Sequence, residues 1–240
     1  MVKNMGFLDY IFPQDYKCIF CKCELPEGGI CNDCINSLPL IKGKTCVNCG
    51  GRVVNNNDVC LDCKGSTNIY DKGFCVFDYT DKIQEKILKF KNRKYKHIGY
   101  AFAREMLSKF KTINIPFDII IPVPIHENRR RARGFNQSEI LCQDINDYYG
   151  RVRNDVLIRA VDTCRQSELN RANRLKNLSN AFKVTDKSKV KGKFILLVDD
   201  IYTTGSTINE CAKVLKKVGA EKVYFLCLAR TPIVVDNVIR

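Results

Sequence analysis

The strongest hydrophobic pattern in the chain lies in its C-terminal part. Two apolar runs, KFILLVD at residues 193–199 and KVYFLCLA at residues 222–229, are short and uninterrupted, as in strands buried on both faces of a parallel sheet. The more polar stretch between them carries apolar residues at helical spacing: Ile208, Cys211, Ala212, Val214, Leu215 and Val218. Gly219 suits the end of that helix. The pattern predicts a strand–helix–strand unit, in which ligands bind beyond the carboxyl ends of the strands.

Two other segments have helical periodicity. A helix is predicted to follow residues 134–138 (GFNQS), with apolar positions at Ile140, Leu141 and Ile145. Either Asn136 or Ser138 is suited to cap it. The basic stretch at residues 82–97 predicts an amphipathic helix whose lysines face outward and whose core side chains are Ile83, Ile87, Leu88 and Phe90.

Cysteine spacing adds a different kind of structure to the N-terminal part. Four CxxC pairs follow one another at Cys18/Cys21, Cys31/Cys34, Cys46/Cys49 and Cys60/Cys63. Two residues between thiols allow a tight turn to direct both sulfurs at one ion, and two such pairs complete a tetrahedral site. The spacing predicts two structural zinc sites with four cysteine ligands each, with Fe–S clusters as the alternative metal and free thiols or disulfides as the alternative without metal. Sequential pairing, first pair with second and third with fourth, is the simplest, and a cross-braced pairing is also compatible with the spacing. Cys23 and Cys75 do not belong to any CxxC pair.

Composition and charge divide the chain in the same region. The protein has 240 residues, a formal net charge of +14 and 14 cysteines, ten of which lie before residue 76. Acidic and basic residues balance in residues 1–70, so the positive excess lies in residues 71–240. We expect a Cys-rich zinc module at 1–68 and an α/β domain at 69–240, divided within a small, polar stretch. The excess charge favours anionic partners, either phosphorylated ligands or nucleic acid.

The apolar segments also bear on the compartment. The start of the chain lacks the continuous apolar region of a secretory signal. No apolar run reaches the roughly 18 to 20 residues of a membrane span. A reducing, cytoplasmic location is therefore expected, which disfavours a disulfide scaffold for the cysteines.

The segment VDDIYTTGST, at residues 198–207, combines two kinds of ligand group. Its second half suits a phosphate, because the next helix offers free N–H groups, Gly205 permits close backbone approach, and hydroxyl donors come from Thr203, Thr204, Ser206 and Thr207. Asp199 and Asp200 suit sugar hydroxyls, or Mg²⁺ held through water. Together the two halves predict a site for a phosphorylated ribose.

The same residues carry a resemblance to known families. ILLVDDIYTTGST resembles the ribose-phosphate signature of type I phosphoribosyltransferases at every position. FDIIIPVPIHENRRRARGFNQS, the region around DTCRQSELNRANRLKNLSNAF and the CxxC pairs resemble the ComF family of bacterial natural transformation, over nearly the whole chain. The resemblance implies an α/β fold with a parallel sheet flanked by helices and an N-terminal double zinc ribbon. It also implies phosphoribosyl pyrophosphate with Mg²⁺ as ligand, and single-stranded DNA and other transformation proteins as partners.

The resemblance implies roles at matching positions. Asp199 and Asp200, the expected catalytic pair, would bind the 2- and 3-hydroxyls of the ribose, and residues 203–207 would hold its 5-phosphate. The strand DIIIPVP ends at the position of the pyrophosphate loop, with Val123 and Pro124, and residues 163–176 correspond to a mobile loop. Such proteins are often described as amidophosphoribosyltransferases, but residue 2 is Val rather than a processed Cys and no glutaminase domain fits. We therefore reject glutamine-dependent ammonia production.

Basic residues supply the remaining candidates. Arg129 and Arg133 follow the pyrophosphate loop, where guanidinium groups suit phosphate oxygens, although such a run is also typical of a solvated basic face. The GFNQ motif adds Asn136 and Gln137, whose chemical task the spacing does not reveal. Four residues of the basic stretch are interpreted as contacts to the phosphates of single-stranded DNA: Lys86, Lys89, Lys91 and Arg93. The alternative is that they form the solvated face of a helix.

Three functions are compatible with these residues. The first is a ComF-like protein that binds phosphoribosyl pyrophosphate and assists single-stranded DNA in transformation. The second is an active phosphoribosyltransferase with a nucleobase or another acceptor, and the third is a sensor of phosphoribosyl pyrophosphate without turnover. The fold alone cannot separate them, because function lies in the site. The intact acidic pair favours retained ligand binding, with pentosyl transfer as the expected reaction.

Overall fold

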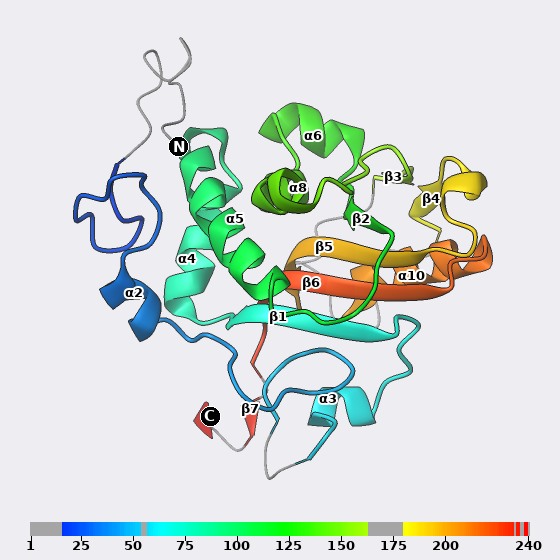
Figure 1. The fold of residues 1–240 in the computed structure, drawn as a ribbon, viewed down its shortest axis with the longest axis horizontal. Coiled ribbons are helices and arrows are strands. Elements are labelled where there is room, and N and C mark those ends of the chain that lie inside the picture. The colour runs from blue at the N-terminus through cyan, green and yellow to red at the C-terminus, as the bar shows by residue number, and fades with distance from the viewer. Residues whose placement is uncertain (1–15, 54–56, 163–179, 233, 236–237, 240) are drawn as a thin grey trace.

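A four-stranded parallel sheet forms the centre of the molecule (Figure 1). The computed structural model describes residues 16–53, 57–162, 180–232, 234–235 and 238–239. In the order in which they pair, the strands are β1 (Lys72–Asp78), β6 (Lys222–Arg230), β5 (Phe194–Tyr202) and β2 (Ile119–Pro122). All four run in the same direction, so their carboxyl ends meet at one edge. The α/β fold with a parallel sheet is confirmed.

Side chains of the central strands alternate between two hydrophobic clusters. In β5, Ile195 and Leu197 pack with the cluster that contains the apolar face of α10, whereas Leu196 and Val198 pack with the helices on the opposite face. Both faces are covered, which explains the uninterrupted apolar run. The covering helices are α4 (Asp81–Phe90), α5 (Lys96–Phe110), α7 (Gln137–Leu141) and α8 (Gln143–Tyr149) on one face and α10 (Ser206–Lys217) on the other.

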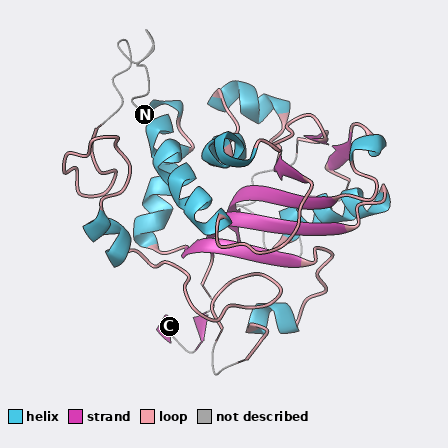
Figure 2. Cartoon of the chain, in the orientation of Figure 1, coloured by secondary structure: helices cyan, strands magenta, loops and turns pink. Residues whose placement is uncertain are grey.

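Several short elements complete the described part of the chain (Figure 2). They are α2 (Asn32–Ser37), α3 (Leu61–Lys64), η1 (Arg93–Tyr95), α6 (Glu127–Arg133), the antiparallel pair β3 (Leu157–Arg159) and β4 (Phe182–Val184), η3 (Lys187–Lys189), and the antiparallel pair β7 (Val234–Val235) and β8 (Val238–Ile239). Among the described residues, none of the helices has the length and apolar character needed to span a membrane.

The structure corrects two boundaries expected from the sequence. The basic stretch 82–97 is not one helix, because α4 ends at Phe90 and the Asn92 side chain caps the separate turn η1 by accepting from Lys94 N at 3.0 Å. Strand β5 does not end at Asp199 but continues to Tyr202, still paired in register with β6. The two aspartates therefore stand on the end of a rigid strand rather than in a loop.

One core assignment in the basic stretch is also wrong. Leu88 is 54% exposed, whereas Ile83, Ile87 and Phe90 are fully buried. The three buried residues lie at spacings of four and three, along one stripe of α4, and Leu88 lies beside that stripe. The hydrophobic character of Leu88 predicted a core position, but α4 exposes the Leu88 side chain at the surface.

The two halves of the Cys-rich part lie on different sides of the sheet domain (Figure 1). The first half, with α2, lies beside α4 and α5, where Arg104 donates to the carbonyls of Glu27 and Gly28 at 2.8 Å each. The second half, with α3, lies under β1, where Gly73 N donates to Asn48 O at 2.6 Å. The expected division into domains 1–68 and 69–240 stays a prediction.

Candidate functional site

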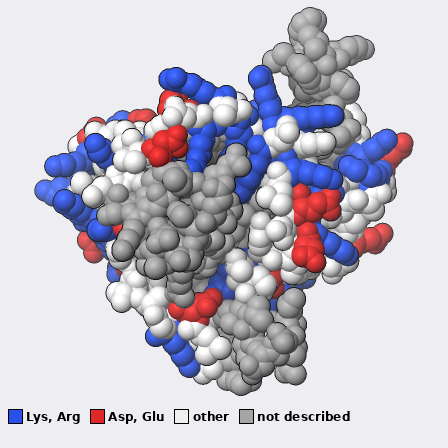
Figure 3. All heavy atoms as spheres, turned by 180° about the vertical axis from the view of Figure 1, so that it is seen from behind, with Lys and Arg blue, Asp and Glu red and all other residues white. Residues whose placement is uncertain are grey.

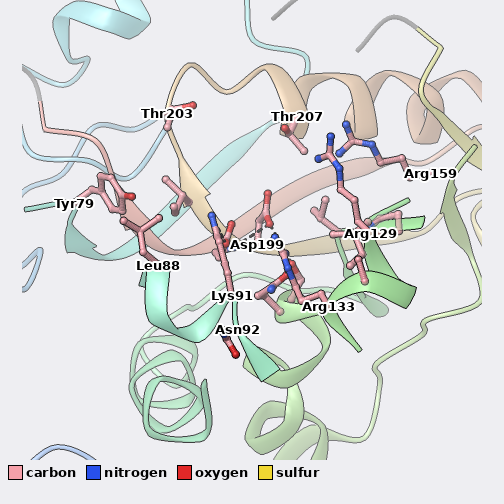
Figure 4. A pocket seen from close by; sticks show the side chains of 18 of the residues that line it. Tyr79, Leu88, Lys91, Asn92, Arg129, Arg133, Arg159, Asp199, Thr203 and Thr207 are labelled. Carbon is pink, nitrogen blue, oxygen red and sulfur yellow. Dashed lines mark hydrogen bonds and ion pairs between the residues drawn. The ribbon is translucent and has the colours of Figure 1, made fainter. Parts of the chain in front are cut away.

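A cleft of about 800 Å³ opens at the carboxyl ends of β5 and β2 (Figure 4). Tyr79, Leu88 and Lys91 lie on one side of it, and three arginines lie on the other, with Asp199 between them. The predicted site residues that line it are Val123, Pro124, Arg129, Arg133, Gln137, Asp199, Asp200, Thr203 and Thr207. The tertiary structure therefore brings together segments that lie up to 128 residues apart — from Tyr79 of the β1–α4 connection to Thr207 of α10.

The two aspartates are held by different partners. The Oδ1 atom of Asp199 accepts from Ser138 Oγ at 3.1 Å and from Asp200 N at 2.9 Å. Burial, together with the negative charge of Asp200, raises the pKa of Asp199 to about 7. Asp200 forms an ion pair with Lys91 at 3.4 Å. The pair therefore offers carboxylate oxygens in a site where a cation or hydroxyl donors would relieve their repulsion.

Residues 203–207, which we term the hydroxyl loop, comprise the turn after β5 and the first two residues of α10. Thr203 and Thr207 line the cleft, whereas Thr204, Gly205 and Ser206 do not. Instead, the hydroxyls of Thr204 and Ser206 lie 2.7 Å apart, and Gly205 precedes α10 with φ +75°. An added Cβ at Gly205 would be strained at this φ and would lie 2.5 Å from Tyr202 Oη. The loop therefore needs glycine at this position.

Arginines from two separate elements form the basic side of the cleft. Arg129 and Arg133 come from α6, as the sequence predicted, and Arg159 comes from the end of β3. Burial, together with the charge of Arg129, lowers the pKa of the Arg159 guanidinium. Sequence reasoning missed Arg159, because it stands alone in the apolar run VLIRAV at residues 156–161, with no recognisable motif around it. Arg130 instead forms a double hydrogen bond with Glu139, at 2.7 and 3.1 Å.

The GFNQ motif, whose task the sequence did not reveal, ties the walls of the cleft together. Asn136 is buried outside the cleft lining, where its Nδ2 donates to Val123 O at 3.0 Å and its Oδ1 accepts from Ser138 N at 3.2 Å. Gln137 accepts a hydrogen bond from Arg133 through its Oε1. Asn136, rather than Ser138, is thus the cap of α7. The motif positions the β2 loop, Arg133 and, through Ser138, Asp199.

The four residues predicted to contact nucleic acid do not share one surface. Lys91 lies in the cleft, and the Lys86 side chain is only 12% exposed, with its ammonium 5.5 Å from the centre of the Phe20 ring. Lys89 is outward-facing and pairs with Glu85 at 2.7 Å. Arg93 lies over Gly134. The expectation that the lysines of this stretch all face outward is therefore wrong for Lys86.

The eight CxxC cysteines gather into two groups with the sequential pairing. Cys18, Cys21, Cys31 and Cys34 form the first tetrad, and Cys46, Cys49, Cys60 and Cys63 form the second; within each, the sulfurs lie within 4.8 Å of one another. Backbone N–H groups also point at the thiols, with Cys31 N donating to Cys18 Sγ at 3.4 Å and Cys60 N to Cys46 Sγ at 3.3 Å. Four sulfurs with such donors suit a closed structural zinc site. The cross-braced alternative is wrong.

Comparisons with known proteins agree with these features. Residues 97–235 match the phosphoribosyl transferase domain, and residues 7–64 match the double zinc ribbon domain. Competence protein F of Haemophilus influenzae is 30% identical over 90% of this chain and 97% of its own length.

The chain belongs to the ComF family. Other members are the DNA utilization protein YhgH of Escherichia coli, 32% identical over 89% of this chain and 96% of its own, and the competence protein ComFC of Bacillus subtilis, 31% identical over 81% and 80%. A solved hypoxanthine phosphoribosyltransferase from Staphylococcus aureus aligns with 56% of this chain and 64% of its own, at 12% identity and a TM-score of 0.36. This ComF-family chain thus has a phosphoribosyltransferase domain and two four-cysteine zinc sites.

Proposed function

We propose that this ComF-family protein binds phosphoribosyl pyrophosphate with Mg²⁺ in the cleft, and that it assists single-stranded DNA during DNA uptake. The observation that carries the ligand is that one cleft is lined by the Asp199 and Asp200 carboxylates, by Thr203 and Thr207 of the hydroxyl loop, and by three arginines. Such a set of groups matches a molecule that combines a diol with several phosphates. The relatives' printed names, competence and DNA utilization proteins, support the DNA part.

Each part of the ligand has a chemically suitable partner. Ribose hydroxyls donate well to Asp199 and Asp200, and the 5-phosphate suits the hydroxyl loop and the N-terminus of α10. The pyrophosphate suits Arg129, Arg133 and Arg159, since guanidinium groups bind phosphate oxygens through two parallel hydrogen bonds. The aspartates would hold Mg²⁺, which would offset the charge of the pyrophosphate.

Arg159 permits a direct test of this ligand. In calorimetric titrations with phosphoribosyl pyrophosphate and Mg²⁺, Arg159→Gln should bind about tenfold more weakly than the wild type, because a hydrogen bond to a charged group contributes about 1.5–3 kcal/mol. Arg131→Gln is the matched control, since Arg131 is 75% exposed and pairs with Glu127 on the outer side of α6. Equal affinities for the two variants would show that Arg159 does not contact the ligand. Absence of binding by the wild type would refute phosphoribosyl pyrophosphate as the ligand.

A second candidate activity is transfer of the ribose phosphate to an acceptor. Tyr79 and Leu88 lie beside the aspartates, away from the arginines, and Gln84, one turn before Leu88 in α4, also lines the cleft; together they offer aromatic, apolar and amide groups. These groups suit a planar, hydrogen-bonding acceptor such as a nucleobase. In that reaction the bond from the anomeric carbon to pyrophosphate breaks and a bond to the acceptor forms. Release of pyrophosphate only when a nucleobase is added would support turnover, and its absence with every base would favour a binding role.

Contact with DNA would use the exposed basic residues. Figure 3 shows Lys and Arg side chains in several groups on one face, with Asp and Glu between them, rather than one continuous band. Replacing both Lys89 and Arg93 with alanine should lower the slope of log affinity against log salt by about 1.4 for a single strand, since each phosphate contact contributes about 0.7. Filter binding over a salt series measures this, with Lys187→Ala as control, and an unchanged slope would exclude both residues from the contact.

A further inference from the structure

Arg230, the last residue of β6, is a charged side chain with almost no access to solvent. It is 1% exposed and lies beside the second tetrad. Its Nη2 donates to Cys60 Sγ at 3.4 Å and to Asp62 Oδ2 at 3.0 Å, and its Nη1 donates to Thr231 O at 3.0 Å. The backbone of the second half of the Cys-rich part approaches Arg230 so closely that a Cβ at Gly51 would collide with the Arg230 side chain.

A buried arginine at this place has an electrostatic reason. Four cysteine thiolates around Zn²⁺ carry a net charge of −2, which is costly to bury without a compensating cation. Arg230 provides a positive charge and a hydrogen-bond donor to one of the sulfurs. Groups that donate to metal ligands in this way orient the ligands and change metal affinity by about 10- to 100-fold when they are removed.

The other side of Arg230 faces the end of β5. Its guanidinium lies over the ring of Tyr202, 5.9 Å from the ring centre, and the two residues are direct neighbours in the sheet. Tyr202 is otherwise held by Phe225, stacked at 5.0 Å between ring centres, and by Tyr70, whose hydroxyl lies 2.7 Å from its own. Arg230 is thus a polar link between these aromatic rings and the second tetrad.

Tyr202 in turn supports the hydroxyl loop. Its hydroxyl lies directly under Gly205, at the position where any Cβ on that residue would collide. Gly205 begins α10 and sets the direction of the N–H groups at its first turn. A continuous series of contacts therefore runs from Cys60 through Arg230 and Tyr202 to Gly205.

We propose that Arg230 is a positioning residue that couples the metal of the second tetrad to the hydroxyl loop. With metal bound, the Cys60 thiolate would hold the guanidinium. The guanidinium holds the Tyr202 ring, and the ring holds the loop in the shape that the cleft requires. The first tetrad lies beside α4 and α5 and is separated from this series of contacts. The coupling is reciprocal, so an ordered loop also slows loss of metal from the second tetrad. This inference does not depend on which ligand the cleft binds.

The test measures both ends of the series in the full-length, zinc-loaded protein. Zinc release to a chromogenic chelator reports on the tetrads, and hydrogen–deuterium exchange of peptides that cover residues 203–209 reports on the loop. Arg230→Gln should release one of its two zinc ions about tenfold faster than the wild type and exchange faster in 203–209. Arg230→Lys, which keeps the charge but not the planar group, should partly restore zinc retention.

Two conservative variants show which contacts carry the coupling. Tyr202→Phe removes only a hydroxyl and should speed exchange in 203–209 and, because the coupling is reciprocal, also speed zinc release, by less than Arg230→Gln does. Arg104→Gln removes the comparable arginine beside the first half of the Cys-rich part and should leave loop exchange unchanged. Where Arg230→Gln does not fold, Asp62→Asn takes its place, because Asp62 is 49% exposed and holds the same guanidinium.

Two results would overturn the proposal. In the first, Arg230→Gln or Asp62→Asn releases zinc faster while exchange in 203–209 stays at the wild-type rate, which would make Arg230 a partner of the metal site only. In the second, Arg104→Gln speeds loop exchange as much as Arg230→Gln, which would show a general loss of stability. Failure of the cleft to bind phosphoribosyl pyrophosphate would change neither of these two interpretations, because zinc release and loop exchange are measured without that ligand.

Discussion

Replacing Asp199 and Asp200 together with asparagine is expected to lower the affinity for phosphoribosyl pyrophosphate with Mg²⁺ by at least about a hundredfold. In the proposed complex each carboxylate accepts a hydrogen bond from a ribose hydroxyl. A hydrogen bond to a charged group contributes about 1.5–3 kcal/mol, so the loss of both should lower the affinity by more than two factors of ten. Asparagine keeps the shape of both side chains. Calorimetry measures the change, with Asp147→Asn on the exposed side of α8 as control. Affinity within threefold of the wild type would remove the aspartates from the site.

The same double variant should be more stable than the wild type at high pH. Burial and the charge of Asp200 raise the pKa of Asp199 to about 7, above the value of about 4 for an unfolded aspartate. The folded state therefore binds this proton more tightly, and ionised Asp199 lowers the stability of the folded state increasingly as pH rises from about 4 to about 7. The gain in melting temperature should be largest near pH 8 and shrink toward pH 5. Lower melting temperatures for the variant across this range would mean that the carboxylates support the fold itself.

Loss of metal from the second tetrad is expected to have the largest effect on stability. Its four cysteines are all buried within one of the two core clusters, together with Tyr70 and Cys75, whereas Cys21 of the first tetrad is exposed. Structural zinc contributes about 10–16 kcal/mol to folding in small zinc-binding peptides, as much as the total stability of an ordinary domain. Cys49→Ser should therefore lower the melting temperature by more than about 10 °C, and Cys21→Ser by clearly less.

Circular dichroism melts together with elemental analysis check this difference. Each variant should retain about one zinc ion per chain, because the intact tetrad still provides four thiolates. Equal losses of melting temperature for the two variants would contradict a special role of the second tetrad in the core. A wild-type protein without zinc would refute both sites at once.

Local chemistry accounts for what sequence reasoning predicted well. The CxxC pairs indicated two tetrads because ligands within a turn of each other depend little on the remaining fold, and the structure confirms the sequential pairing. The apolar runs indicated β5, α10 and β6 because burial on both faces leaves no polar positions in a strand. The motif at residues 198–207 indicated a ligand site for the same reason as the cysteines, since its groups are neighbours in the chain.

Amphipathic stretches were less informative. Periodicity showed that residues 82–97 are basic and partly apolar, but not that α4 stops at Phe90 or that Leu88 is exposed at the cleft. Lys86 and Lys91 belong to the same stretch and have different surroundings, one under the Phe20 ring and one beside Asp200. Which neighbour each lysine meets depends on how α4 packs, and the spacing of charges carries no record of that packing.

The sequence alone was enough to predict the α/β fold, the two four-cysteine sites and a ligand site at the end of β5, because each rests on residues close together in the chain. Only the tertiary structure brought Arg159 and Tyr79 to the same cleft, explained GFNQ as a set of positioning contacts, and placed Arg230 between Cys60 and Tyr202. These contacts join residues 13 to 170 positions apart. Such pairs leave no local pattern, since it is the packing of strands and helices from distant parts of the chain that makes them neighbours.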